Sequence, residues 1–172
     1  MAVSIPIVPA AEAAPAQVRD IQHYMRPGVL QLTSLPPLAL YVHLPWCLKK
    51  CPYCDFNSHG LQGELPEAEY SAALLADLQQ SLPLIWGRRV ESIFFGGGTP
   101  SLFSPEALAT LISQFRALLP LSPMCEITLE ANPGTFERER FAAFAQAGVT
   151  RLSIGVQSFQ DRYLQVLGRV HD

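Results

Sequence analysis

LALYVHLPWCLKKCPYCDFNSHG, residues 38–60, joins a short apolar run to a loop that carries three cysteines. Residues 38–44 are almost continuously apolar, which is expected of a strand that is covered on both faces of a parallel sheet. Cys47, Cys51 and Cys54 come soon after this run, in the spacing C-x3-C-x2-C. A buried strand that leads into a ligand-bearing loop is typical of α/β proteins, whose binding sites form at the carboxyl edge of the sheet.

The rest of the chain alternates short apolar runs with amphipathic stretches, and this alternation predicts further strands and helices. Strands are expected over 38–44, 90–95, 126–131 and 151–156. Helices are expected over 66–82, 105–118 and 136–147, with another that begins near residue 161. Strands that alternate with helices build a parallel sheet through right-handed crossover connections. The sequence therefore predicts the α/β class.

Local capping signals mark two of the expected helices. Ser104 and Pro105 suit the N-cap and the first position of the helix over 105–118. Thr135 is the expected N-cap of the helix over 136–147, and Gly148 is expected to end it. These two helices are therefore predicted with defined limits.

Composition sets outer limits on function. A chain of 172 residues with 49% hydrophobic and 16% charged residues resembles an ordinary globular domain, or part of one. The net charge of −3 and the lack of any Lys/Arg run argue against nucleic-acid binding and against a polybasic membrane patch. No apolar stretch approaches the about 18 residues of a membrane-spanning helix. Clustered cysteines without a secretory signal indicate a reducing compartment, so we expect the cytoplasm.

The chain is expected to divide near residue 35. Residues 1–35 are interpreted as a flexible N-terminal extension, whose Ala- and Pro-rich start lacks the basic residues of a signal peptide. Residues 36–172 are interpreted as the core domain. Because a parallel sheet that stops there would leave an edge strand and helix faces uncovered, we expect this region to be the N-terminal part of a larger, truncated domain.

The cysteine trio has three chemical interpretations. Cys51-Pro-Tyr-Cys54 by itself resembles a glutaredoxin-type dithiol, but such a pair sits at a helix N-terminus, and residues 57–60 (NSHG) predict a loop. Zinc would need a fourth ligand, such as His43 or His59, and structural zinc sites more often use two separated pairs. A four-iron cluster with three thiolate ligands keeps one iron open for chemistry, and we favour this interpretation. Cys125 stands alone before an apolar strand and is expected to be an inert buried residue.

Three more segments follow predicted strands, namely Gly96-Gly-Gly-Thr-Pro100, Glu130-Ala-Asn-Pro133 and Gln157-Ser-Phe159. The glycine run has neither the Gly-Lys-Ser/Thr of a Walker loop nor the spacing of a dinucleotide site. Each segment alone is as consistent with a turn or a paired loop residue as with a ligand contact. Their shared position after successive strands favours one common ligand site.

Four segments together resemble the radical S-adenosylmethionine (SAM) proteins related to oxygen-independent coproporphyrinogen III dehydrogenase. They are HLPWCLKKCPYCDFNSHG, FFGGGTPSLF, LEANPGT and RLSIGVQSFQDRYLQVLGRVH, which occur in the family's order from about residue 36 onward. The resemblance implies a partial (β/α)6 barrel, with about four β/α units present in this chain. It also implies that Cys47, Cys51 and Cys54 bind a [4Fe–4S] cluster. The implied SAM contacts are Tyr41, Tyr53, Gly97, Gly98, Thr99, Glu130, Gln157 and Arg169.

Position 56 departs from the dehydrogenases, which carry a fourth cysteine two residues after the third. Phe56 stands there instead, as in the HemW group of heme chaperones, which the sequence most resembles. This likeness implies a protein that binds the cluster, SAM and heme, and that delivers heme to acceptor proteins. The alternative is an oxidase that converts coproporphyrinogen III to protoporphyrinogen IX by a 5′-deoxyadenosyl radical, so catalysis is left open. Candidate heme ligands are His23, His43, His59 and His171.

Overall fold

The computed structural model describes residues 26, 28–29, 34–85 and 87–169, with the backbone alone described over 135–138. Most of the expected extension over 1–35 lies outside these residues, as do His23 and His171. The chain divides into two compact units, Met1–Pro36 and Pro37–Asp172. The second unit holds all the elements described below.

Parallel strands form the main sheet, and each strand pairs with the next main-sheet strand along the chain. The four-stranded sheet has the order β1-β4-β5-β6, with bounds Leu38–Leu44, Val90–Gly97, Leu121–Ala131 and Arg151–Ile154. The register places Tyr41 opposite Phe94 and Glu130 opposite Ser153. All four strands therefore end at one edge of the sheet, as expected for the carboxyl edge of a parallel sheet.

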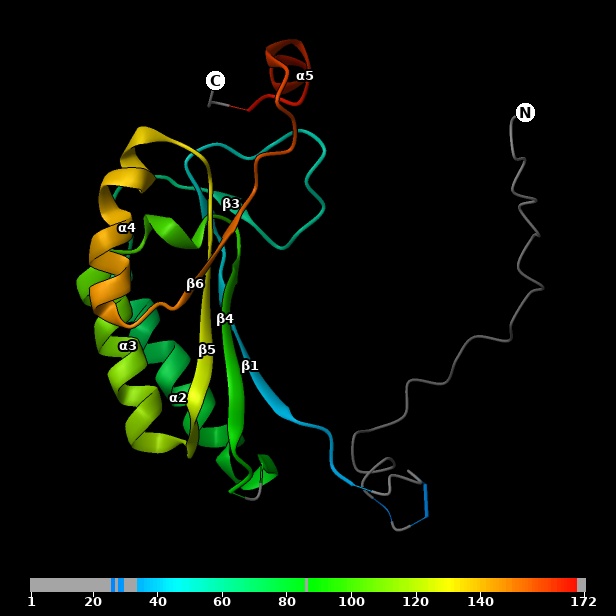
Figure 1. Ribbon diagram of the computed structural model, residues 1–172, viewed down its shortest axis with the longest axis vertical. Helices are drawn as coiled ribbons and strands as arrows, with labels where there is room; N and C mark the ends of the chain where they lie inside the picture. Colours follow the sequence, from blue (N-terminus) through cyan, green and yellow to red (C-terminus); the bar gives the residue numbers. More distant parts are fainter. Residues whose placement is uncertain (1–25, 27, 30–33, 86, 170–172) are drawn as a thin grey trace, which may run out of the picture. The chain divides into compact units, whose positions relative to one another are not determined.

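The long helices lie on one face of this sheet (Figure 1). They are α2 (Glu67–Ile85), α3 (Pro105–Leu118) and α4 (Thr135–Ala147), and a short α5 (Asp161–Val166) follows β6. Right-handed crossovers between sequential neighbours carry every connecting helix to the same side. This singly wound arrangement is that of a (β/α) barrel that is not closed, so the predicted fold class is confirmed.

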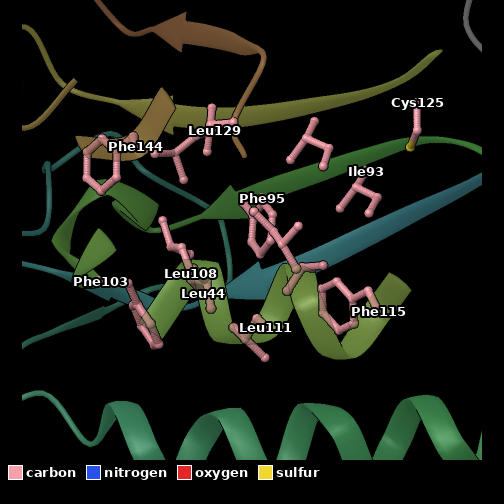
Figure 2. Close-up of a cluster of buried hydrophobic side chains, with 14 of the residues drawn as sticks. Leu44, Ile93, Phe95, Phe103, Leu108, Leu111, Phe115, Cys125, Leu129 and Phe144 are labelled. Atoms are coloured by element: carbon pink, nitrogen blue, oxygen red, sulfur yellow. The ribbon is translucent and has the colours of Figure 1, made fainter. Parts of the chain in front are cut away.

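The hydrophobic core fills the space between the sheet and these helices. Figure 2 shows Phe95 and Leu129 from the strands directed at Leu108, Leu111 and Phe115 of α3. Phe144 of α4 and Phe103, which precedes α3, complete this cluster of fully buried side chains. Cys125 lies in the same core and is buried, as the sequence predicted. Within the described residues, none of the helices combines the length and the hydropathy needed to cross a bilayer.

Two local predictions need correction. The expectation that residues 38–44 are covered on both faces is wrong, because Val42 and Leu44 are buried while Tyr41 is 57% exposed. In a singly wound sheet the helices cover only one face, and alternate residues of each strand point to the other. Thr135 is the first residue of α4 and not its N-cap, which is Gly134.

The N-cap of α3 and the C-terminal end of α4 agree with the sequence, whereas α2 is longer than expected. The hydroxyl of Ser104 accepts a hydrogen bond from the Ala107 amide at 3.1 Å, so Ser104 caps α3 as expected. Gly148 has φ 109° and ends α4 in the left-handed conformation that glycine adopts readily. Helix α2 runs past its expected end and includes Pro83, whose missing N–H removes one hydrogen bond from the last turn.

Candidate functional site

The cysteine loop begins where β1 ends and is closed at its base by a small second sheet. Here β2 (Trp46–Cys47) pairs in parallel with β3 (His59–Gly60). The His59 amide donates to the Pro45 carbonyl at 2.7 Å, and the Leu61 amide donates to the Cys47 carbonyl at 2.8 Å. Lys50 reaches across the loop and donates from Nζ to the Ser58 carbonyl at 2.8 Å. These bonds close the backbone that carries the cysteines into one loop after the end of β1.

All three loop cysteines are unpaired thiols that line one pocket of about 200 Å³. Cys47 is buried, and Cys51 and Cys54 are half-buried. The thiol of Cys54 lies 3.4 Å from the Ser58 hydroxyl. The pocket is lined by the cysteine loop and by residues at or after the ends of β4, β5 and β6. In Figure 1, the loop that leads to β3 and helix α5 lie near this end of the sheet.

The loop geometry bears on the rival interpretations. Residues 48–66, all of them described, contain no helix, so the helix N-terminus that activates a glutaredoxin-type dithiol does not follow Cys54. The described residues hold no group of three His, Cys, Asp or Glu side chains arranged around a single metal ion. A [4Fe–4S] cluster does not require such a group, because each of its cysteines binds a different iron.

The glycine run at the end of β4 packs against the backbone of the cysteine loop. The Gly98 amide donates to the Leu44 carbonyl at 2.9 Å, and the Thr99 amide donates to the Trp46 carbonyl at 2.7 Å. A Cβ added at Gly98 would lie 2.5 Å from the Trp46 carbonyl oxygen, so only glycine permits this approach. The Gly98 and Thr99 amides are thus already used within the protein. The backbone groups that the glycine run can offer a ligand are carbonyl oxygens, which suit an ammonium group.

Glu130 stands at the end of β5 with its carboxylate toward the neighbouring strand end. Its Oε2 accepts a hydrogen bond from the Gly97 amide at 3.2 Å. Burial raises the pKa of Glu130, and the Gly97 amide and the nearby His43 lower it in part. A cationic or hydroxyl-bearing ligand would stabilise the charged form of this half-buried carboxyl, because it would replace the hydrogen bonds to water that burial removes.

His43 lies beside this carboxyl and is held by hydrogen bonds from both ring nitrogens. Its Nε2 lies 2.7 Å from the Asn57 carbonyl, and its Nδ1 lies 3.3 Å from the Tyr41 hydroxyl. A carbonyl oxygen only accepts, so Nε2 carries the proton and, in the neutral ring, Nδ1 accepts from Tyr41. Burial raises the pKa of Tyr41, and the charge of Glu130 raises it further.

Arg169 approaches the cysteine loop from the segment after α5. Its Nη1 lies 3.6 Å from Cys51 Sγ, while its Nη2 donates to Asn132 Oδ1 at 2.6 Å and to the Gly155 carbonyl at 2.7 Å. Gln157 lies nearby with φ 64°, the only positive φ of a non-glycine residue in the described part. A left-handed conformation at a glutamine is strained, and such strain clusters at functional sites.

The structure brings most of the predicted site residues together around the pocket. Those that line it are Cys47, Cys51, Cys54, Tyr53, Gly97, Gly98, Thr99, Glu130, Gln157 and Arg169. Tyr41 does not belong to this lining; it stacks on Phe94 on the face of the sheet opposite the helices. Sequence reasoning did not single out Asn132, Ser153 or Gly155, which also line the pocket. Their position at the ends of β5 and β6 was the signal that could have found them.

The donor groups fit an iron–sulfur cluster and a charged small cofactor. Three cysteine side chains line the pocket from one loop, and cysteines are the ligands that hold Fe–S clusters. Arg169 Nε is buried without a hydrogen-bond partner among the described residues, which is unusual for a guanidinium and suits an acceptor atom of a ligand. Glu130 supplies the opposite charge on the β5 side of the same pocket.

Comparison with known proteins points to one family. The model of the Radical SAM superfamily matches residues 41–172. The chain is 56% identical over 140 residues to "Heme chaperone HemW" of Escherichia coli (strain K12), a match that covers 81% of this chain and 37% of that protein. It is 50% identical over 133 residues to "Radical S-adenosyl methionine domain-containing protein 1, mitochondrial" of Bos taurus, covering 77% of this chain and 30% of the relative.

A solved structure is similar in fold as well as in sequence. It is described as "Coproporphyrinogen III oxidase (HemN) from Escherichia coli is a Radical SAM enzyme", and it superposes with a TM-score of 0.71 at 31% identity. The match covers 79% of this chain and 31% of that one. The chain therefore spans about 37% of the length of the heme chaperone and less of the oxidase.

Proposed function

The chain belongs to the radical SAM superfamily, and on this premise we propose that the protein is a heme chaperone that binds a [4Fe–4S] cluster and SAM and delivers heme to acceptor proteins. The observation that carries the proposal is the pocket in which Cys47, Cys51 and Cys54 meet Glu130 and Arg169. The proteins named heme chaperones among its relatives support the choice of function within the family.

Cys47, Cys51 and Cys54 would hold the cluster, and the rest of the pocket would hold SAM. When bound, the cluster supplies one electron to the sulfonium group of SAM. The chain's own part is positioning: Lys50 and the β2–β3 ladder hold the cysteine loop, and the glycine run presents carbonyl oxygens. The guanidinium of Arg169 suits a carboxylate through its positive charge and its Nε–H, which has no partner among the described residues, while its Nη2 already donates to Asn132 and Gly155. Gln157, Thr99 and Tyr53 complete the proposed SAM contacts.

Tyr41 is part of the same proposal with a different role. Tyr41 lies outside the pocket lining and donates a hydrogen bond to His43, which in turn donates to the Asn57 carbonyl of the cysteine loop. We propose that Tyr41 supports the SAM site indirectly, by holding His43 and this loop in place. His43 uses both ring nitrogens in internal hydrogen bonds, which makes it a poor candidate for a heme ligand. His59 is exposed and contacts Asn57 Oδ1 through Nε2 at 3.2 Å, so it is the better of the two described histidines.

The alternative function is oxidation of coproporphyrinogen III, which the similarity to the oxidase structure supports. Against it stands Phe56, which lines the pocket and is 66% exposed at its mouth, where the dehydrogenases carry a fourth cysteine. An exposed aromatic ring at that place offers a flat apolar surface to a porphyrin and no thiol chemistry. We therefore rank heme handling above porphyrinogen oxidation.

The test combines cluster assays with heme titration of the anaerobically reconstituted protein. We expect iron and sulfide in equal amounts, a broad visible absorption that is lost in Cys51→Ala, and heme uptake without turnover. Cys125→Ala is the matched control, because Cys125 lies in the core away from the pocket and its loss leaves all three thiolates. An unchanged colour in Cys51→Ala contradicts cluster binding by this loop.

Incubation with SAM, a reductant and coproporphyrinogen III separates the two functions. Formation of protoporphyrinogen contradicts a chaperone without oxidase activity. Transfer of heme from the loaded protein to an apo-hemoprotein, measured by the Soret band of the acceptor, is the result expected of a chaperone. We place the protein in the cytoplasm, because three clustered free cysteines suit a reducing compartment.

A further inference from the structure

Asn132 joins three segments of the pocket through one side-chain amide. It follows β5, and its Nδ2 donates to the Thr99 hydroxyl at 3.3 Å while its Oδ1 accepts from Arg169 Nη2 at 2.6 Å. The orientation of the amide is determined by chemistry, because a guanidinium has only donors and must face the oxygen. Thr99 belongs to the loop after β4, and Arg169 follows α5. One amide thus links the glycine run to the arginine that approaches the cysteines.

The guanidinium of Arg169 is held by hydrogen bonds from Nη2, while its Nη1 is directed at the thiol of Cys51. Nη2 is shared between Asn132 Oδ1 and the Gly155 carbonyl, and Nη1 lies 3.6 Å from Cys51 Sγ. The backbone of this segment also abuts the loop, since a Cβ at Gly168 would lie 3.2 Å from Pro52 Cδ. Two acceptors on Nη2 leave the planar group little freedom to rotate away from the sulfur.

From these contacts we infer that Asn132 is a positioning residue, which holds the positive charge of Arg169 against Cys51 and so sets the reduction potential of the proposed cluster. The inference rests on the proposed function, because it takes Cys51 as a cluster ligand. Reduction adds negative charge to the cluster, and a positive charge or a hydrogen bond at a ligating sulfur favours the reduced form. The side-chain hydrogen bonds of Asn132 go to Thr99 and Arg169, so it acts on Cys51 through Arg169.

The test is a double-mutant cycle on the midpoint potential of the reconstituted holoprotein, measured by EPR-monitored titration without SAM. Asn132→Leu keeps the size of the side chain and removes both hydrogen bonds, and Arg169→Gln removes the charge. We expect each single variant to shift the potential to more negative values. In the Arg169→Gln background, Asn132→Leu is expected to add no further shift, since residues that act through one another are not additive.

Two results overturn the inference. One is an unchanged potential in Asn132→Leu when Arg169→Gln shifts it, and the other is additive shifts in the double variant. If Asn132→Leu fails to take up iron, Thr99→Val decides, because it removes only the hydroxyl that holds the amide. A shift of the same sign in Thr99→Val supports the inference and no shift overturns it.

Failure of the proposed function gives a different pattern. Wild-type protein without a cluster contradicts both the proposed function and the inference that rests on it. A cluster without heme uptake contradicts the proposed function alone, and its midpoint potential still tests the role of Asn132. If the wild-type protein holds a normal cluster and Asn132→Leu leaves its midpoint potential unchanged, only the positioning role is contradicted.

Discussion

The Gly97 amide donates a hydrogen bond to Oε2 of Glu130 across 3.2 Å, and this contact joins the ends of two neighbouring strands at the mouth of the pocket. Gly97 has φ +122°, and a Cβ there would lie 2.9 Å from the Leu44 carbonyl oxygen. Only glycine therefore allows β4 to present its amide to the carboxyl group. The pairing couples the titration of Glu130 to the stability of the strand ends.

Glu130→Gln is expected to stabilise the ligand-free protein near neutral pH. Burial is the main cause that raises the pKa of Glu130, so the fold favours the protonated carboxyl. That contribution is complete below the ordinary value of 4.5 and is lost as the pH rises through the folded-state pKa. Glutamine does not ionise, and its side-chain oxygen can accept the same hydrogen bond.

Thermal unfolding from acidic to neutral pH checks this prediction. The gain of Glu130→Gln over the wild type should be small in acid and should grow as the pH rises. A difference that stays constant across the range would show that ionisation of this carboxyl is not its cause. In the same variant we expect weaker SAM binding by the holoprotein, because the negative charge on the β5 side of the pocket is gone.

Gly98→Ala is expected to displace the cysteine loop and to lower its iron content. A Cβ at this position would lie 2.5 Å from the Trp46 carbonyl oxygen and 2.7 Å from the Pro45 carbonyl oxygen, which are backbone atoms that cannot move alone. Gly60→Ala is the matched control in the same loop, because a Cβ there meets nothing within 4 Å. Equal iron and sulfide content in the two variants would contradict the prediction.

Gln157→Gly is expected to weaken SAM binding without lowering the stability of the protein. The residue has φ 64°, a conformation that costs an L-residue about 1–2 kcal/mol and costs glycine little. Relief of this strain opposes the greater chain entropy of glycine, so we expect unfolding free energy to stay level or to rise by up to about 1 kcal/mol. SAM affinity should fall, because the amide is lost.

The control for this variant is the same substitution where the backbone is ordinary. Gln146→Gly, at an exposed position of helix α4, is expected to lose about 1 kcal/mol of stability. Chemical denaturation of both variants gives the comparison. A loss at position 157 as large as that at position 146 would mean that the left-handed conformation stores no strain.

Glu67→Ala is expected to destabilise the protein by about 1–3 kcal/mol. The carboxylate accepts from the Ser104 amide at 2.5 Å and from the Ser104 hydroxyl at 2.6 Å, so it ties the first turn of α2 to the N-cap of α3. Glu69→Ala is the control, because Glu69 lies in the same turn and is exposed. We expect it to change the unfolding free energy by less than about 0.5 kcal/mol, as is usual for surface positions.

Capping and periodicity explain which parts of the fold the sequence predicts well. Helix α3 begins and ends where expected, because Ser104, Pro105 and the apolar stripe are all local signals. Strand β4 is longer than expected, since Gly96 and Gly97 pair with His43 and Leu44 of β1. A glycine run reads as a loop by local propensity, and only the neighbouring strand makes it part of the sheet.

By itself, the sequence determined the α/β class, the order of strands and helices, and the cysteine loop at a strand end, because these follow from patterns within a few residues. Only the tertiary structure decided which groups meet there. Arg169 reaches Cys51 across 118 positions of the chain, and Asn132 connects it to Thr99. The tertiary structure also decided that Tyr41 lies outside the pocket lining. Such contacts join segments that lie far apart in the chain, so no pattern within a few residues specifies them.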